Sequence, residues 1–197
     1  MDVVEIIGAS IGLLYLFLEY KANVWLWPVG IVMSAFYVVI YATGRFYADA
    51  ALNVYYIFAN IYGLAVWTYR KRTGGAAGNT ATDELTISKT PKKKILPLAV
   101  SAGLLWLAIY LVLGKFTDSP VPVGDAFTTS LSIVAMWMLA HNYLEQWLLW
   151  IVVDVVSVAL YFWKGLYPTA VLYIVYVAVA VMGYISWKRQ YVNSRAE

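Results

Sequence analysis

The sequence contains no cysteine, one histidine and few charged residues. Of its 197 residues, 13% are Asp, Glu, Lys or Arg. Without cysteine the chain has no disulfide, no thiolate metal ligand and no cysteine nucleophile. The single histidine, His141, stands beside Asn142 near the expected end of a helix, where a loop role is more common than a catalytic one. One histidine cannot build a zinc site alone, so we expect neither a metal nor a cofactor.

Motifs that bind nucleotides or carry out hydrolysis are also missing. The sequence has no P-loop, no glycine-rich dinucleotide fingerprint and no Ser-His-Asp arrangement. The net charge of +3 is too small to indicate a nucleic-acid partner. These absences argue against an ATP-driven pump and against the known types of hydrolase. We expect a protein that is not an enzyme.

Hydrophobic residues are abundant, at 62% of the chain, which is more than an ordinary soluble domain contains. They form seven segments near the length of about 20 residues that a helix needs to cross a bilayer. The segments cover approximately residues 4–20, 24–42, 47–69, 95–114, 125–141, 147–163 and 166–187. The sequence therefore predicts an all-α integral membrane protein with seven transmembrane helices.

Lysine and arginine are distributed unevenly between the loops. The loops on the side of the membrane where the first helix starts contain three of the 14 basic residues, namely Arg45, Lys115 and Lys164. The loops and the C-terminus on the opposite side contain the other eleven. The positive-inside rule then places the N-terminus outside and the C-terminus inside. Residues 73–94, which contain glycines, threonines and a run of lysines, are predicted to form a flexible cytoplasmic linker.

The chain matches itself without a gap at an offset of 120 residues. Matching pairs include Trp27 and Trp147, Tyr41 and Tyr161, Tyr56 and Tyr176, Gly63 and Gly183, and Trp67 and Trp187. Two repeats of three helices separated by one helix both start on the same side of the membrane, so the sequence predicts parallel repeats in a 3+1+3 order. We assign residues 1–72 to the first repeat, 95–116 to the central linking helix and 117–197 to the second repeat. Transporters use this design, with the site near the midplane between the halves.

A carboxylate stands in the middle of the sixth predicted helix. Trp147, Trp150, Asp154, Ser157 and Tyr161 follow at steps of 3, 4, 3 and 4, so they share one helix face. Asp at the centre of a membrane helix costs about 2.5 to 3.5 kcal/mol and usually marks a transport pathway. The alternative is a protonated Asp that joins two helices by a hydrogen bond. We favour the functional interpretation.

Polar and aromatic faces with similar spacing occur in three other predicted helices. Lipid gives no reason to present Asn or Asp, so these faces should point inward. The alternative for tryptophans near helix ends is an interfacial belt, and glycines such as Gly30, Gly63 and Gly183 would permit close helix packing. The expected substrate-binding residues are Trp147, Trp150, Asp154, Ser157, Ser34, Tyr37, Asn53, Tyr56, Asn60, Tyr173 and Tyr176.

A cavity walled by Trp and Tyr and holding one carboxylate suits a flat aromatic cation, because the rings stack on it and Asp154 offsets its charge. Passive, substrate-gated flux is the simplest mechanism, while coupling to sodium or protons stays open. A proton relay through Asp49 and Asp154 has few titratable groups to use. A non-transporting receptor that uses the basic loop is a second hypothesis. A membrane enzyme is a third, but it lacks a nucleophile and a base.

The stretches GRFYADAALNVYYIFANIYGLAVW and EQWLLWIVVDVVSVALYFWKGLYPTAVLY resemble the PnuC family of vitamin transporters, and the resemblance covers nearly the whole chain. It implies a seven-helix core of two three-helix repeats, a homotrimer in the bacterial cytoplasmic membrane, and facilitated diffusion of a vitamin that a cytoplasmic kinase then traps by phosphorylation.

Two branches of that family carry nicotinamide riboside and thiamine. The riboside branch is associated with asparagine where this chain has Asp154 and with glutamine where it has Asn53. The segment LEYKANVWLWPVGIVMSAFYVVIYATGRFYAD resembles the thiamine branch, the PnuT type. Both vitamins carry a positive charge on an aromatic ring, so a carboxylate serves either. The resemblance favours thiamine as the substrate, with nicotinamide riboside as the alternative.

Overall fold

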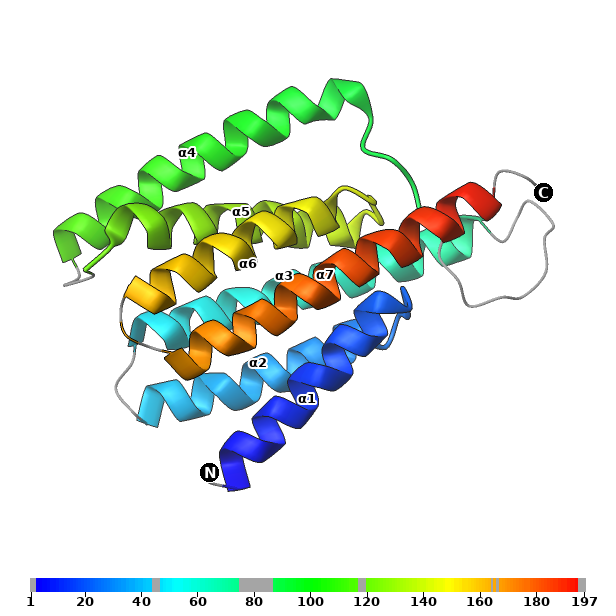
Figure 1. The fold of residues 1–197 in the computed structure, drawn as a ribbon. Coiled ribbons are helices and arrows are strands. Elements are labelled where there is room, and N and C mark those ends of the chain that lie inside the picture. Colours follow the sequence, from blue (N-terminus) through cyan, green and yellow to red (C-terminus); the bar gives the residue numbers. More distant parts are fainter. Residues whose placement is uncertain are drawn as a thin grey trace. The chain divides into compact units, whose positions relative to one another are not determined.

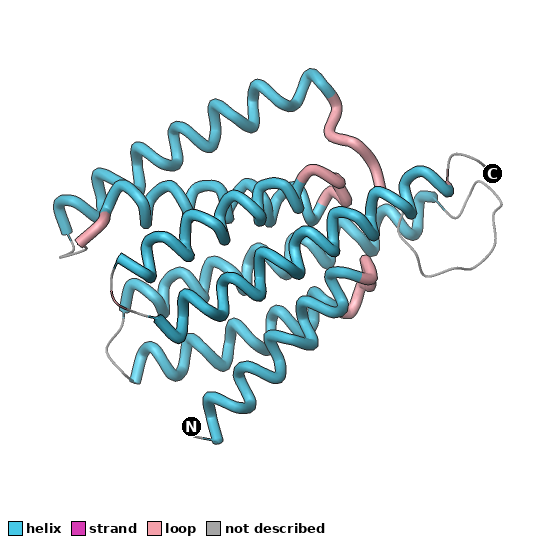
Figure 2. The backbone as a smooth tube through the Cα atoms, viewed as in Figure 1, coloured by secondary structure: helices cyan, strands magenta, loops and turns pink. Residues whose placement is uncertain are grey.

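The computed structural model describes residues 3–43, 47–74, 87–116, 120–163, 165 and 167–194. These residues form seven helices, joined in the described parts by short loops (Figures 1 and 2). The helices are α1 (Val3–Tyr20), α2 (Leu26–Thr43), α3 (Tyr47–Gly74), α4 (Lys92–Phe116), α5 (Pro122–Ala140), α6 (Gln146–Trp163) and α7 (Tyr167–Asn193). The described backbone contains one isolated bridge, between Ser88 and Tyr143, and no strand. The predicted all-α class is therefore confirmed.

Four of the described helical segments are long and apolar enough to cross a membrane: Lys92–Phe116, Pro122–Ala140, Gln146–Trp163 and Ala170–Asn193. Leu26–Val39 is a shorter apolar stretch within α2. Many large apolar side chains in these helices face outward, which is the arrangement expected of helices in contact with lipid. The chain is an integral membrane protein.

Two helices end five or more residues later than the sequence predicted. The third was expected to end near residue 69 and the seventh near residue 187, but α3 continues to Gly74 and α7 to Asn193. Both extensions contain basic residues, and a prediction from hydrophobicity ends the transmembrane segment before such residues. Because charged residues sustain a helix outside the apolar core, the helices project beyond the predicted segments.

The boundaries of the predicted linker also differ. Residues 73 and 74 belong to α3, and Lys92–Lys94 form the first turn of α4. Residues 75–86 lie outside the described part of the chain. The remaining stretch, from Ile87 to Pro91, is docked: Ile87 is buried, and the backbone N–H of Leu144 donates to the carbonyl oxygen of Ser88 at 2.9 Å. Part of the predicted flexible linker is therefore ordered.

The contacts divide the chain into two compact units, one formed by Met1–Thr86 with Ala140–Asn142 and the other by Ile87–Leu139 with Tyr143–Glu197. In the first unit α2 packs against α1 and α3. Trp27 of α2 is fully buried and meets Trp67 of α3 edge to face, with ring centroids 5.3 Å apart. A Cβ on Gly63 would collide with the Trp27 ring, so this glycine permits the two helices to approach closely.

In the second unit α6 packs against α7 in the same way, through two tryptophans and a glycine. Trp147 and Trp187 are buried and meet edge to face with centroids 5.7 Å apart, and a Cβ on Gly183 would lie 2.6 Å from the Trp147 ring. Helix α4 lies against α5, where Leu98, Ala102 and Leu105 contact a small core around Val134, Met138 and Tyr143. The predicted role of Gly63 and Gly183 in close packing is therefore confirmed.

The offset of 120 residues found in the sequence holds for the backbone as well. Helices α2 and α6 begin at positions 26 and 146, and α3 and α7 begin at positions 47 and 167. The loop before α2 has Ala22 at a positive φ of 49°, and the loop before α6 has Asn142 at 55°. Asn23 N–H donates to the Leu18 carbonyl at 2.9 Å, and Tyr143 N–H donates to the Met138 carbonyl at 3.0 Å. Equivalent loops thus end their preceding helices in the same way.

Candidate functional site

The centre of the candidate site is Asp154, near the middle of α6. Its side chain is 7% exposed. Within the described residues it forms neither a hydrogen bond nor an ion pair, and no lysine or arginine is available within α6 itself. The hypothesis that this Asp joins two helices through a hydrogen bond requires a partner, and the described structure supplies none. A buried carboxylate without a partner supports a role in binding instead.

Trp150 lies one turn before Asp154 on the same face of α6. It is half-buried, and its indole Nε1 is enclosed without an acceptor among the described residues. Buried indole N–H groups normally find a hydrogen-bond partner. Ser157, one turn after Asp154, is also buried. The three side chains therefore form a continuous strip that combines an aromatic surface, a carboxylate and a hydroxyl.

Helix α7 contributes tyrosines beside this strip within the second unit. The ring of Tyr173 lies 5.0 Å from that of Tyr161 in α6 and 5.3 Å from that of Tyr176, measured between centroids. Tyr173 and Tyr176 are half-buried. The rings of Tyr161 and Tyr173 are tilted by 42° and those of Tyr173 and Tyr176 by 56°, so the three form an aromatic cluster next to the strip.

Trp147 belongs to the predicted set but has a structural role as well. It is 1% exposed, contacts Trp187 and fills the space that Gly183 leaves. The alternative of an interfacial belt does not fit Trp147, because its ring is enclosed between α6 and α7. The surface that Trp147 offers to a ligand is consequently much smaller than that of Trp150.

The first unit holds the other predicted residues. Ser34 and Asn60 are 1% and 2% exposed. Asn60 Nδ2 donates to the Tyr56 carbonyl at 2.7 Å, while its Oδ1 has no donor among the described residues. A Cβ on Gly30 would meet Asn60 Cγ at 2.7 Å and the Tyr15 ring at 2.9 Å. The missing side chain of Gly30 thus makes room for Asn60. The Oδ1 atom of Asn60 can still accept a hydrogen bond.

The remaining predicted residues of the first unit, Tyr37, Asn53 and Tyr56, are half-buried. Tyr37 contacts Phe36 at 5.9 Å and Tyr56 contacts Tyr55 at 5.7 Å between ring centroids. The side chain of Asp49, proposed as a relay partner, lies outside the described residues. The predicted residues therefore form two sets, each within its own unit: the strip on α6 in the second unit, and a polar strip of α2 and α3 residues in the first.

Sequence reasoning missed Gln146, the first residue of α6. Its side chain is fully buried, and both amide atoms have no hydrogen-bond partner among the described residues. Gln146 stands four residues before Trp150, so helical spacing extends the strip by one turn. That spacing was visible in the sequence. A glutamine at a helix end is usually solvated, so the spacing alone does not predict that Gln146 is buried.

The described residues contain no group of three His, Cys, Asp or Glu side chains that would hold a metal ion. Glu145, the nearest other carboxylate on the chain, accepts hydrogen bonds from the N–H and hydroxyl of Thr90, both at 2.8 Å. Within the described residues, the α6 strip therefore consists of an aromatic ring, a carboxylate, a hydroxyl and an amide. It offers stacking, one negative charge and a few hydrogen-bonding groups.

Three relatives share most of their length with this chain. It is 27% identical to the nicotinamide riboside transporter PnuC of Escherichia coli, over 98% of this chain and 87% of that protein. It is 28% identical to the PnuC protein of Neisseria mucosa, over 93% and 71%. It is 26% identical to the riboflavin/roseoflavin transporter RibM of Streptomyces davaonensis, over 93% and 83%. None of these three is named as a thiamine transporter.

The fold has a solved counterpart. A crystal structure of the vitamin B3 transporter PnuC superimposes with a TM-score of 0.73 and 23% identity, covering 94% of this chain and 80% of the other. A family model described as nicotinamide mononucleotide transporter matches residues 2–189. The relatives are transporters, and this chain is likewise a membrane transport protein and not an enzyme. It belongs to the nicotinamide mononucleotide transporter family, the PnuC family of vitamin transporters.

Proposed function

We propose that this chain takes up a vitamin of the nicotinamide riboside type across the bacterial cytoplasmic membrane by facilitated diffusion. The observation that carries the proposal is the buried, unpaired carboxylate of Asp154 beside Trp150 on one face of α6. Two of the relatives are nicotinamide riboside transporters by name. Phosphorylation inside the cell would trap the vitamin and maintain the inward gradient.

The proposed contacts follow from the chemistry of the ligand. Nicotinamide riboside carries a positive charge on a pyridinium ring, which stacks on Trp150 and the neighbouring tyrosines while Asp154 offsets the charge. A cation held over an aromatic face gains about 0.5 to 2 kcal/mol. Ser157 and Gln146 supply hydrogen-bonding groups for the carboxamide or the ribose. Because each contact is weak, the strip as a whole is needed for binding.

The preference for thiamine expected from the sequence is not supported by the relatives, and nicotinamide riboside fits them better. The expectation depended on Asp154 and Asn53, which replace the asparagine and glutamine associated with the riboside branch. A carboxylate attracts thiazolium and pyridinium equally, so the charge at position 154 carries no information about which ring binds.

The arrangement in the membrane is part of the proposal. We propose two parallel three-helix repeats around α4, with the N-terminus outside and the C-terminus inside, assembled as a homotrimer. The matching helix bounds and loops at an offset of 120 residues support the repeat. Lysines in the first turn of α4, and Lys188 and Arg189 near the end of α7, support the orientation. The trimer rests on the resemblance to the family.

The test is uptake of radiolabelled nicotinamide riboside, thiamine and riboflavin into liposomes that contain the purified protein. We expect nicotinamide riboside to enter fastest, without stimulation by a proton or sodium gradient. Trp150→Ala and Asp154→Asn should each reduce uptake by about tenfold, as expected for a loss of about 1.4 kcal/mol.

Matched control variants are Trp163→Ala, an exposed tryptophan of the same helix, and Asp125→Asn in α5, and both should retain wild-type uptake. Entry of thiamine alone would contradict nicotinamide riboside as the substrate and support the thiamine preference expected from the sequence. Wild-type uptake in both Trp150→Ala and Asp154→Asn would show that the substrate binds elsewhere.

A further inference from the structure

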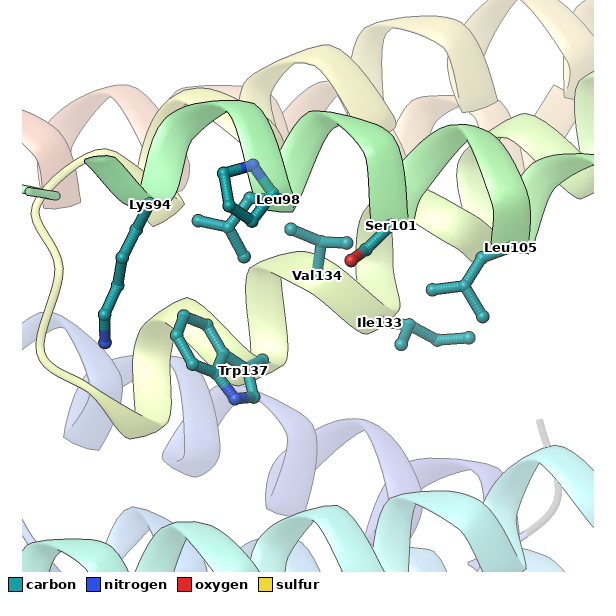
Figure 3. A pocket seen from close by; sticks show the side chains of 8 residues that line it. Lys94, Leu98, Ser101, Leu105, Ile133, Val134 and Trp137 are labelled. Carbon is teal, nitrogen blue, oxygen red and sulfur yellow. The ribbon is translucent and has the colours of Figure 1, made fainter. Parts of the chain in front are cut away.

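A groove of about 420 Å³ runs between α4 and α5 within the second unit, away from the α6 strip. Its walls are apolar, and the lining residues are Lys94, Pro97, Leu98, Ser101, Leu105, Ile133, Val134 and Trp137. Figure 3 shows Lys94 and Trp137 at one end, Ser101 in the middle and Leu105 at the other end. The groove therefore has a charged end and a long hydrocarbon end.

Lys94, at the charged end, is a half-buried cation without an anion. Its Nζ donates to the Tyr143 hydroxyl at 3.1 Å and lies 5.2 Å from the centroid of the Trp137 ring and 5.6 Å from that of Tyr143. In the part of the chain that the structure describes, no carboxylate pairs with it. A hydroxyl and two ring faces orient the ammonium group but leave its charge uncompensated.

The position of this cation in its helix adds a second argument. Lys92, Lys93 and Lys94 occupy the first turn of α4, which contains no acidic residue. The partial charge at a helix N-terminus is positive, so cations are disfavoured there and anions are favoured. Topology requires basic residues near the end of a membrane helix but does not require one inside a groove. An anion at this end would neutralise both the lysine and the helix terminus.

The aromatic neighbours indicate the depth at which this end lies. Trp and Tyr are enriched where the hydrocarbon of a bilayer meets the headgroups. Trp137 and Tyr143 flank Lys94, and the apolar part of the groove extends from them along α4 to Leu105. None of the described side chains of α4 is buried, so the groove opens on a helix that faces its surroundings. Lipid reaches such a groove directly.

We propose that this groove binds an anionic phospholipid, whose phosphate pairs with Lys94 and whose acyl chain lies along Leu98, Ser101 and Leu105. The polar headgroup and the hydrocarbon chain of such a lipid match the two ends of the groove. Basic pockets at the headgroup level of membrane proteins bind lipids in this way. The inference is independent of the transported vitamin and requires only that the chain spans a membrane.

The test is native mass spectrometry of the delipidated full-length protein titrated with phosphatidylglycerol or with phosphatidylcholine. We expect wild type to retain phosphatidylglycerol more tightly. Lys94→Gln should weaken phosphatidylglycerol binding about fivefold, the change that corresponds to about 1 kcal/mol for one lysine at a membrane surface, and should remove the preference between the two lipids.

Lys93→Gln is the matched control, because it removes the same charge from an exposed position in the same turn, and it should retain the preference. Ser101→Phe fills the groove without a change of charge and should reduce binding of both lipids. Equal binding of the two lipids to wild type, or no effect of Lys94→Gln and Ser101→Phe, would overturn the proposal. A change in subunit number instead of lipid number would also overturn it, since a second copy would then occupy the groove.

Discussion

The two three-helix segments, α1–α3 and α5–α7, share a framework but differ in the chemistry mounted on it. Both have a tryptophan as the second residue of the middle helix, Trp27 or Trp147, packed against a glycine and a second tryptophan. Both begin that helix after a loop with one residue at positive φ. Residues that define the helix packing have therefore been kept at the same offset, as expected when packing depends on shape.

The positions that face the polar strips differ between the segments. Where the second segment has Trp150 and Asp154, the first has Gly30 and Ser34. In the first segment, the side chain of Asn60 occupies the space beside Gly30. At these two matched positions, a large ring and a carboxylate occur in the second segment only. The matched tryptophans and glycines thus belong to both segments, while the large ring and the carboxylate at these positions belong to the second segment.

The loops before the middle helices differ too. In the first segment Asn23 Oδ1 accepts a hydrogen bond from its own loop, from Trp25 N–H at 2.9 Å. In the second, Glu145 instead holds Thr90, and Leu144 N–H donates to the Ser88 carbonyl. The stretch that precedes α4 therefore restrains the loop before α6.

The largest effect is expected from Trp27→Ala and Trp147→Ala. Each removes a fully buried ring and should lower the free energy of unfolding by about 3 to 5 kcal/mol. Thermal unfolding of the detergent-purified protein, followed by circular dichroism, measures the loss. Trp163→Ala, in which an exposed ring is removed, should change little. A large loss in one segment alone would contradict the shared framework.

A smaller effect is expected from Gly63→Ala and Gly183→Ala. The added methyl group collides with the tryptophan ring in each segment, and overpacking of this kind costs about 1 to 3 kcal/mol. Gly103→Ala in α4 is the control, because its Cβ would meet nothing within 4 Å. That variant should be neutral or stabilised by about 0.5 to 1 kcal/mol. Unchanged melting of both tested variants would show that the helices do not approach as closely as described.

The smallest effect is expected from Glu145→Ala, which removes the acceptor of the two Thr90 hydrogen bonds. We expect a local loss of about 1 kcal/mol, seen as about fivefold faster hydrogen exchange at Thr90 and Leu144. Asn23→Ala is the counterpart in the first segment and should affect only the loop around Trp25. Equal exchange in wild type and Glu145→Ala would mean that the stretch before α4 is held by other contacts.

Much of the fold was predictable from the sequence, because a bilayer fixes the length of an apolar segment and a gapless repeat fixes the register between the segments. The predicted starts of the third and seventh helices lie within one residue of Tyr47 and Tyr167. The ends of α3 and α7 were not predictable from hydropathy, because basic residues continue a helix without adding to an apolar run.

The candidate site was predictable in part. Helical spacing placed Trp150, Asp154 and Ser157 on one face, and the structure agrees that Asp154 and Ser157 are buried there. The enclosure of Trp147 and the contact of Thr90 with Glu145 were not predictable, because they join residues far apart in the chain. The second pair is separated by 55 positions and leaves no periodic signal.

The most direct test of the account is calorimetric titration of nicotinamide riboside into wild type, Trp150→Ala and Trp163→Ala. We expect wild type and Trp163→Ala to bind with equal affinity, and Trp150→Ala to bind at least about tenfold more weakly while melting at a similar temperature. Wild-type affinity in Trp150→Ala would contradict the claim that the strip on α6 binds the vitamin.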